Sequence, residues 1–348
     1  MELDFKTLRR KHLRAVAEAK PFWEAYRRAA EYAAPSINTF CQSKGSTKSP
    51  GVNTSQALQS TNAFICEFIS ALTPPNRRWA ELQPTTALVE EIARQNSASD
   101  EHAIRSALDV TYETITKKFF ECLDSSNFYD VLKQFVLSIG IGTGCMLMNE
   151  LDYGRGAGNA VPFEFIYVPV SNLSLDAGNN NRIYGVFRDM RVRREEIPEL
   201  WFDGDASGLE EKEEYNLVEC CVYAPQRVGD MHPWVFCVFD SDEDVKVVQD
   251  RRLAYNPYIV FRWSTVEGES LGRGPILEAM ADIKSLNRLW ETYFAWVQRN
   301  SLGMTLVKNS ELAYTNLSNF ENFDLKPGTL IPVNDPASYV PLKISGEL

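Results

Sequence analysis

The strongest pattern of apolar and polar positions lies between residues 258 and 300. It opens as a predicted strand, Tyr258–Trp263, continues through a loop and reaches the segment Gly272-Arg-Gly-Pro275. Pro275 suits the first turn of a helix, because the N–H that it lacks has no helical partner there and its φ is already helical. No Gly or Pro follows until Gly303, so the pattern predicts one helix of about 26 residues, about 39 Å long.

Apolar residues in this predicted helix lie on more than one face. One stripe is formed by Ile276, Met280, Ile283, Leu286, Trp290, Tyr293 and Val297, and a second set by Leu277, Leu289, Phe294 and Trp296. A helix that is apolar on more than one face must be covered on more than one side. Either it is the central helix of a large core, or neighbouring copies of the chain cover it. The pattern alone leaves both interpretations open.

In the first part of the chain, apolar residues recur at the intervals typical of helices. Two helices are predicted between Leu3 and Ala34, the second beginning at Pro21. The first of them carries a basic set, Lys6, Arg9, Arg10, Lys11 and Arg14. We interpret these bases as a solvated helix face, with contact to an acidic partner or to DNA as the alternative.

After a polar loop at residues 36–51, three further helices are predicted at residues 57–72, 90–124 and 128–139. The segment Thr73-Pro-Pro-Asn-Arg-Arg-Trp79 ends the first and leads into a short predicted strand, Trp79–Leu82. Asn127 is expected to cap the last helix. The segment Gly140-Ile-Gly-Thr-Gly144 then follows. Because it lacks the Lys-Ser/Thr of a phosphate-binding loop, it predicts a tight turn into a strand.

From Cys145 to Trp263 the apolar residues tend to recur at every second position instead of every third or fourth. This pattern predicts a β-rich part between helical layers. The candidate strands are Cys145–Leu151, Pro162–Val168, Arg182–Arg191, Asn216–Ala224, Trp234–Asp240, Val245–Gln249 and Tyr258–Trp263, with one short helix at Arg193–Trp201. Ten acids gather between Glu195 and Glu219. They allow a cation site or acid–base chemistry, but without EF-hand spacing a solvated acidic surface is favoured.

The composition fits a protein with two or three domains and a sizeable core, since 348 residues include 44% hydrophobic ones. No apolar run reaches the roughly 18–20 residues that cross a bilayer. The net charge of −11 argues against a tight, sequence-reading DNA binder, but not against a surface past which DNA slides. Seven cysteines and three histidines match no metal pattern, so we expect reduced core cysteines and no metal or cofactor.

Several short motifs together resemble one protein family. They are Thr73-Pro74-Pro75 with Trp79, then Gly142-Thr-Gly144, then Gly272-Arg273-Gly274-Pro275, and finally Asp282-Ile-Lys-Ser-Leu-Asn287. In this order and spacing, the chain resembles the portal, or head-to-tail connector, proteins of short-tailed (podovirus-like) tailed bacteriophages. The resemblance runs from about Leu3 to the C-terminus.

The resemblance implies an α+β, portal-like fold. Residues 1–144 would form the helical part of a wing, residues 145–263 its β-rich part, residues 264–303 the stem helix and residues 304–348 a clip. In the family the chain continues into a second stem helix, a tunnel loop and crown segments. We expect these to lie outside this sequence.

The resemblance also implies a function. Family members form a ring, usually of twelve subunits, at one capsid vertex, and double-stranded DNA is packaged and ejected through it. The expected partners are further copies of the chain, non-specifically passing DNA, the terminase large subunit, tail adaptors, and the major capsid and scaffolding proteins, with no membrane. The expected location is the virion, and the host cytoplasm during assembly. The family's portal hydrolyses nothing, so an enzyme is not expected.

On this reading the predicted stem helix carries two sets of candidate site residues. Lys284, Arg288, Glu291 and Arg299 are candidates for the channel or stem surface, and Trp290, Phe294 and Val297 for the subunit interface. Two other functions stay open. One is an α+β enzyme that uses the clustered carboxylates, and the other is a non-viral, ring-forming adaptor.

Overall fold

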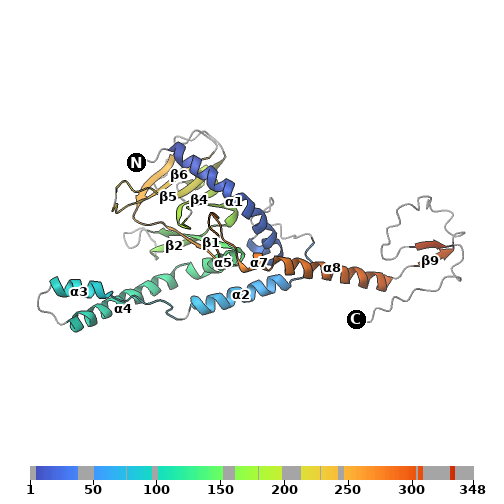
Figure 1. Ribbon diagram of the computed structural model, residues 1–348, viewed down its shortest axis with the longest axis horizontal. Coiled ribbons are helices and arrows are strands. Elements are labelled where there is room, and N and C mark those ends of the chain that lie inside the picture. The colour runs from blue at the N-terminus through green and yellow to red at the C-terminus, as the bar shows by residue number, and fades with distance from the viewer. Residues whose placement is uncertain are drawn as a thin grey trace. The chain divides into compact units, whose positions relative to one another are not determined.

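The computed structural model divides the chain into two compact units, Met1–Met280 and Ala281–Leu348 (Figure 1). It describes residues 5–37, 51–95, 101–151, 161–197, 213–241, 247–302, 305–308 and 330–333, except for residues 76, 179 and 228 within these ranges. Helices and sheets both contribute, which confirms the predicted α+β class. In the part of the chain that is described, no helix is both long and apolar enough to cross a membrane.

Helices make up most of the first 141 residues. The helices are α1 (Phe5–Ala33), α2 (Gln56–Leu72), α3 (Thr86–Gln95), α4 (Glu101–Ser125), α5 (Phe128–Ile141), α7 (Pro275–Glu278) and α8 (Met280–Leu302), and 3-10 turns lie at Pro35–Ile37, Val170–Asn172 and Arg194–Glu196. Within the larger unit, α2 packs along α5, and α3 packs along α4. Of the predicted helix Arg193–Trp201, only the short turn from Arg194 lies in the described residues.

Helix α1 is continuous, so the predicted break at Pro21 is wrong. Pro21 lies inside the helix, where it lacks the N–H that would bond the carbonyl of Ala17. Both residues are exposed, which leaves that carbonyl on the solvent side. The buried face meanwhile continues past Pro21 from Ala19 to Tyr26. Packing along this face holds the helix together despite the lost hydrogen bond.

Two antiparallel sheets follow the helices in the same unit. The three-stranded sheet has the order β2-β1-β8, with β1 (Thr143–Glu150), β2 (Phe163–Tyr167) and β8 (Tyr258–Arg262). The five-stranded sheet runs in chain order, with β3 (Leu173–Ala177), β4 (Ile183–Arg193), β5 (Glu214–Tyr223), β6 (Trp234–Asp240) and β7 (Val247–Leu253). All predicted strands of this part are present; Trp234–Asp240 has the predicted ends, and the others are shifted by a few residues at one or both ends. Strand β3 was not predicted.

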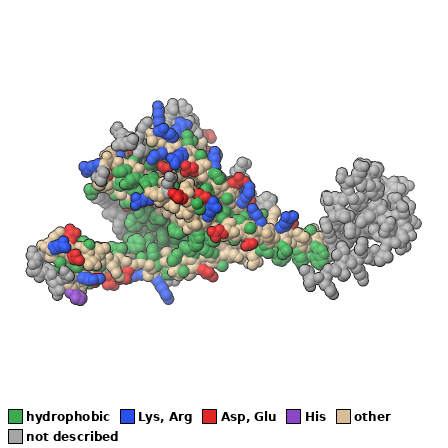
Figure 2. All heavy atoms as spheres, viewed as in Figure 1, with side chains coloured by type: hydrophobic (Ala, Val, Ile, Leu, Met, Phe, Trp, Pro, Cys, Tyr) green, Lys and Arg blue, Asp and Glu red, His purple; other side chains and the backbone are tan. Residues whose placement is uncertain are grey.

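Each sheet packs against a different helix. Helix α5 covers the three-stranded sheet, where Phe135 and Ile139 lie in one buried cluster with Met146. The first half of α1 lies on the five-stranded sheet, where Leu8 and Ala15 are buried with a set of sheet residues: Phe187, Val218, Cys220, Val222, Cys237 and Phe239. Figure 2 shows hydrophobic side chains gathered around β1, β2 and α5, and charged ones over α1 and the five-stranded sheet.

Two residues of the basic set on α1 form ion pairs with acids of the same chain. Lys11 Nζ lies 3.7 Å from Asp176 Oδ2 on β3, and Arg14 pairs with Glu18 on α1 itself. The prediction of a wholly solvated basic face is therefore wrong for Lys11. Its charge helps to seat α1 on the edge of the five-stranded sheet.

One acid of the cluster between residues 195 and 219 is also internal. Glu219 is 3% exposed, accepts a hydrogen bond from the hydroxyl of Tyr258 on β8, and lies 3.6 Å from the guanidinium of Arg188. Burial, with this carboxylate beside it, raises the pKa of the Tyr258 hydroxyl. Glu219 thus ties the two sheets together. Glu195, Glu196 and Glu214 are exposed, as predicted for a solvated surface, and residues 198–212 lie outside the described residues.

The cysteines fit the expectation of reduced core residues only in part. Cys145, Cys220, Cys221 and Cys237 are free and buried, and burial raises the pKa of the Cys221 thiol to about 12. Cys66 on α2 is exposed, so the expectation is wrong there, and Cys41 lies outside the described residues.

The predicted long helix after Gly274 is interrupted. Helix α7 ends at Glu278, Ala279 has a ψ of −2°, and α8 begins at Met280. The interruption contains neither Gly nor Pro, and α7 packs against α1 and α5 while α8 belongs mainly to the second unit. Packing of α7, which the local pattern does not encode, explains why one predicted rod became two helices.

The second unit also contains a small parallel pair of strands. β9 (Thr305–Lys308) pairs with β10 (Leu330–Val333). Both strands lie in residues 304–348, the range that the resemblance assigns to the clip.

The turn after α2 anchors a tryptophan. The Trp79 ring lies 5.4 Å from the ring of Phe120 and 6.4 Å from that of Phe128. The strand predicted from Trp79 to Leu82 does not form, because the N–H of Leu82 donates to Thr116 Oγ1 on α4, at 3.2 Å, rather than to a neighbouring strand.

We predict that Trp79→Ala lowers the free energy of unfolding by about 3 kcal/mol, because a large packed ring is lost between α4 and α5. The matched control is Leu82→Ala, three residues further along the same segment, whose side chain is 49% exposed. Denaturant unfolding, monitored by far-ultraviolet circular dichroism because its signal does not rely on tryptophan, measures the free energy of unfolding of both variants. Equal, small losses for the two variants would show that the turn does not contribute to the core.

Candidate functional site

Two glycine segments that lie far apart in the sequence meet at the base of α7. Gly142 forms the turn between α5 and β1, and Gly272 to Gly274 lead from β8 into α7. The N–H of Gly274 donates to the carbonyl of Ile141 at 2.9 Å. A Cβ on Gly142 would lie within 3.0 Å of the carbonyl oxygen of Gly272, and one on Gly274 within 3.0 Å of that of Gly140. Only glycine allows these backbones to approach so closely. We call this contact the glycine junction.

Tyr26 of α1 and Thr143 of β1 close the glycine junction with side chains. The Tyr26 hydroxyl donates to the carbonyl of Gly272, and the N–H of Gly272 donates to Thr143 Oγ1 at 2.9 Å. The Thr143 hydroxyl lies 3.0 Å from that of Tyr26 and donates to it, since the Tyr26 proton is already used. Tyr26 is 1% exposed, and burial raises the pKa of its hydroxyl well above the usual range. The network is therefore neutral.

Arg262 fastens the loop that leads into the glycine junction. Its guanidinium donates to the carbonyls of Glu269 and Ser270, at 3.3 and 3.2 Å, and also to the carbonyl of Asn181 in the turn between β3 and β4. One half-buried side chain thus connects the five-stranded sheet, β8 and the segment before α7. The N–H of Arg273 adds a bond to the carbonyl of Ser264 at 2.8 Å.

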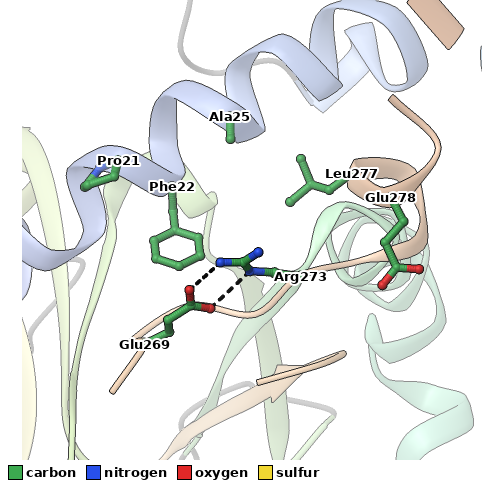
Figure 3. A pocket seen from close by; sticks show the side chains of 7 residues that line it. All are labelled: Pro21, Phe22, Ala25, Glu269, Arg273, Leu277 and Glu278. Atoms are coloured by element: carbon green, nitrogen blue, oxygen red, sulfur yellow. Dashed lines mark hydrogen bonds and ion pairs between the residues drawn. The ribbon is translucent and has the colours of Figure 1, made fainter. Parts of the chain in front are cut away.

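A groove of about 510 Å³ lies beside the glycine junction. Its lining consists of Pro21, Phe22, Ala25, Glu269, Arg273, Leu277 and Glu278, from α1, the loop and α7. Figure 3 shows Glu269 and Arg273 paired across its lower side, with the Phe22 ring directly above them. The groove is mainly apolar, and one of its two carboxylates is neutralised by Arg273. Such a lining suits packing between protein surfaces better than chemistry.

Helix α8 carries the candidate residues of the stem on two sides. Trp290, Phe294 and Val297 recur at spacings of four and three, so they share one face. Ring centroids of Trp290 and Phe294 are 5.6 Å apart, and those of Tyr293 and Trp296 are 6.1 Å apart. Four aromatic side chains of α8 are 36–45% exposed. Whether this face is covered by the core of a larger protein body or by neighbouring copies of the chain stays a prediction.

The charged candidates lie on a different side of α8. Lys284 and Arg288 are four residues apart and share one face, and Arg288 lies about 200° around the helix from Trp290. Lys284, Arg288 and Glu291 are all exposed. The side chain of Arg299 lies outside the described residues. In the described part of the chain, no three His, Cys, Asp or Glu side chains gather as metal ligands would.

The family is decided by a match along nearly the whole chain. The model of the family described as bacteriophage head to tail connecting protein matches residues 6–345. The chain belongs to this family. No curated protein matches the chain closely enough to count as a relative. The chain is thus a connector, a structural component of the phage virion that assembles with capsid and tail components, as the resemblance predicted.

The connector's sequence motifs do not all lie at one place. Gly142-Thr-Gly144 and Gly272-Arg-Gly-Pro275 meet in the glycine junction, whereas Trp79 packs separately against α4 and α5. Sequence reasoning gave no role to the side chains of Tyr26, Thr143 and Arg262, although Thr143 stands in the motif Gly142-Thr-Gly144. Tyr26 falls in the helix predicted from Pro21, and no local pattern reveals that its hydroxyl meets a segment 246 residues further along the chain.

We predict that Tyr26→Phe destabilises the connector by about 1–2 kcal/mol, because it leaves the buried carbonyl of Gly272 without its donor. Tyr32→Phe is the control, since Tyr32 lies on the same helix and no hydrogen bond of its hydroxyl exists among the described residues. Denaturant unfolding compares the two variants with the unmodified chain. A control that loses as much stability as Tyr26→Phe would contradict a specific role of the network.

Proposed function

We propose that the connector acts as a ring of copies, twelve as the resemblance implies, at one capsid vertex, and that double-stranded DNA passes through it during packaging and ejection. The observation that carries this proposal is the exposed aromatic face of α8 in a chain of the head to tail connecting family. A large apolar surface rimmed by polar residues is typical of a protein–protein interface.

The width of this face supports contacts with two neighbours. Leu289 is 66% exposed. On a helix with about 100° per residue, Leu289 and Trp296 mark one end of the apolar arc and Phe294 the other, so the arc spans about half of the helix circumference. In a closed ring each subunit contacts the next one with a surface different from the one by which it contacts the previous one. A broad apolar arc serves both contacts, whereas a narrow stripe would serve one.

The charged side of α8 is then left for the channel. Lys284 and Arg288 supply two positive charges per copy and Glu291 one negative charge, in a chain whose net charge is −11. Few phosphates can be neutralised by so few bases, so DNA is guided rather than held. Contacts to phosphate carry no sequence information, which suits a passage for a whole genome.

The predicted division of the chain gives each part a role in this proposal. Residues 264–303 form the stem, and the glycine junction fixes its first turn to the helical part, residues 1–144, and to the β-rich part, residues 145–263. Residues 304–348 form the clip, on which terminase and tail adaptors dock. Contacts with the major capsid and scaffolding proteins belong to the remaining outer surface of the larger unit.

We predict that Trp290→Asp or Phe294→Asp leaves the connector monomeric, because an aspartate on the aromatic face would be buried without a partner in the ring. The matched control is Ala295→Asp, an equally charged change at an exposed position on the opposite side of α8. Mass photometry of the full-length proteins measures the assembly state. If the unmodified chain stays a monomer at every concentration and salt tested, the ring is excluded.

We also predict weak DNA binding with no sequence preference. The slope of log affinity against log salt is expected to be shallow, and Lys284→Ala with Arg288→Ala is expected to make it shallower still, since each neutralised phosphate contributes about 0.9 to the slope. Fluorescence anisotropy of a labelled duplex between about 50 and 200 mM salt measures this slope. Nanomolar, sequence-specific binding at physiological salt would instead identify a DNA-recognition protein.

A further inference from the structure

The two edges of the three-stranded sheet are treated differently by the chain. At the β2 edge, the side-chain amide of Asn127 donates to the carbonyl of Phe165 at 2.7 Å and accepts from its N–H at 2.8 Å. Asn127 was predicted to cap α5, but it makes no such hydrogen bond. Its amide instead occupies the outward main-chain groups of β2, as a neighbouring strand would.

The β8 edge has no comparable cover. The N–H of Trp263 bonds the carbonyl of Gly142 on the β1 side, at 3.0 Å, so the main-chain groups of alternate β8 residues, at Ile259 and Phe261, also face β1. Those of Val260 and Arg262 face away from the sheet. Among the described residues these outward groups make no hydrogen bond.

Large apolar side chains accompany this open edge. Ile259, Phe261 and Trp263 share one face of β8 and are 41%, 44% and 39% exposed. The Trp263 ring lies 5.9 Å from that of Phe64 on α2, so this apolar surface continues onto the helix. We call Ile259, Phe261, Trp263 and the open edge beside them the β8 ledge.

The other edge strands of the larger unit carry protection that β8 lacks. Strand β7 bears the charges of Asp250, Arg251 and Arg252, and β3 is packed by α1 through the pair of Lys11 with Asp176. Strand β8 contains no Lys, no Pro and no register shift, and its one charged side chain, Arg262, is engaged with the carbonyls of Asn181, Glu269 and Ser270. Apolar, unpaired edges are hazards in a free protein, so such an edge is expected to be covered in the working state.

We propose that a neighbouring copy of the connector covers the β8 ledge and pairs with the main chain of Val260 and Arg262. This inference rests on the proposed ring, in which the next copy adjoins every subunit. Because Asn127 occupies the outward groups of Phe165 on β2, the two edges of this sheet are not equivalent. A neighbour therefore cannot continue this sheet through Phe165, and in a closed ring the β8 ledge meets a different surface of the next copy. The exposed side chains of the ledge are uncharged, so the neighbour presents an apolar surface to them.

Two substitutions test the main-chain and side-chain parts of the contact separately. Val260→Pro removes an outward N–H that the ladder with β1 does not use, and Pro is tolerated in edge strands at such positions. Ile259→Lys leaves the backbone intact and places a charge on the ledge. Met231→Lys, at a 78% exposed methionine in the turn between β5 and β6, is the matched control.

Mass photometry and hydrogen exchange give the outcomes. We expect rings for the unmodified chain and Met231→Lys, and monomers of unchanged circular dichroism for the other two variants. The amides of Val260 and Arg262 are expected to exchange at least tenfold more slowly in the ring than in the Ile259→Lys monomer. Rings that form normally in both ledge variants, or fast exchange at these amides in the ring, overturn the inference while the proposed ring stands. A monomeric unmodified chain overturns both.

Discussion

The structure depends on the close approach of two backbone segments at the glycine junction. The turn after α5 and the segment before α7 touch through main-chain atoms, and any side chain at Gly142 or Gly274 would force them apart. Tyr26 and Thr143 add a buried, neutral hydrogen-bond network that ties α1 to both segments. The glycine junction also holds α7, the short helix from which the chain continues into α8.

Helix α1 and two polar links, one of them buried, join the parts of the larger unit behind that contact. The first half of α1 lies on the five-stranded sheet, and its second half carries Tyr26 into the glycine junction. Glu219 joins the two sheets through Tyr258, and Arg262 joins the turn between β3 and β4 to the loop before α7.

Local pattern predicted the helices and strands well, and the resemblance carried by short motifs identified the family. The errors have a common origin in packing. Pro21 predicted a helix break that the continuous buried face of α1 overrides, and the single rod predicted after Gly274 is interrupted at Ala279, where α7 is held by α1 and α5. Asn127 was predicted to cap α5, whereas its amide completes the edge of β2, 38 residues away. Propensity describes a segment by itself and carries no information about these partners.

The sequence by itself determined the type of most helices and strands and the placing of apolar and charged residues on different faces of α8, because side-chain spacing along a helix or strand is a local property. The tertiary structure alone decided that the two glycine motifs touch, that Glu219 is internal, and that, among the described residues, β2 is capped while β8 is open. Each of these depends on which segments, often more than 100 residues apart, are brought side by side. That choice is made by the packing of whole faces, which no short stretch of sequence contains.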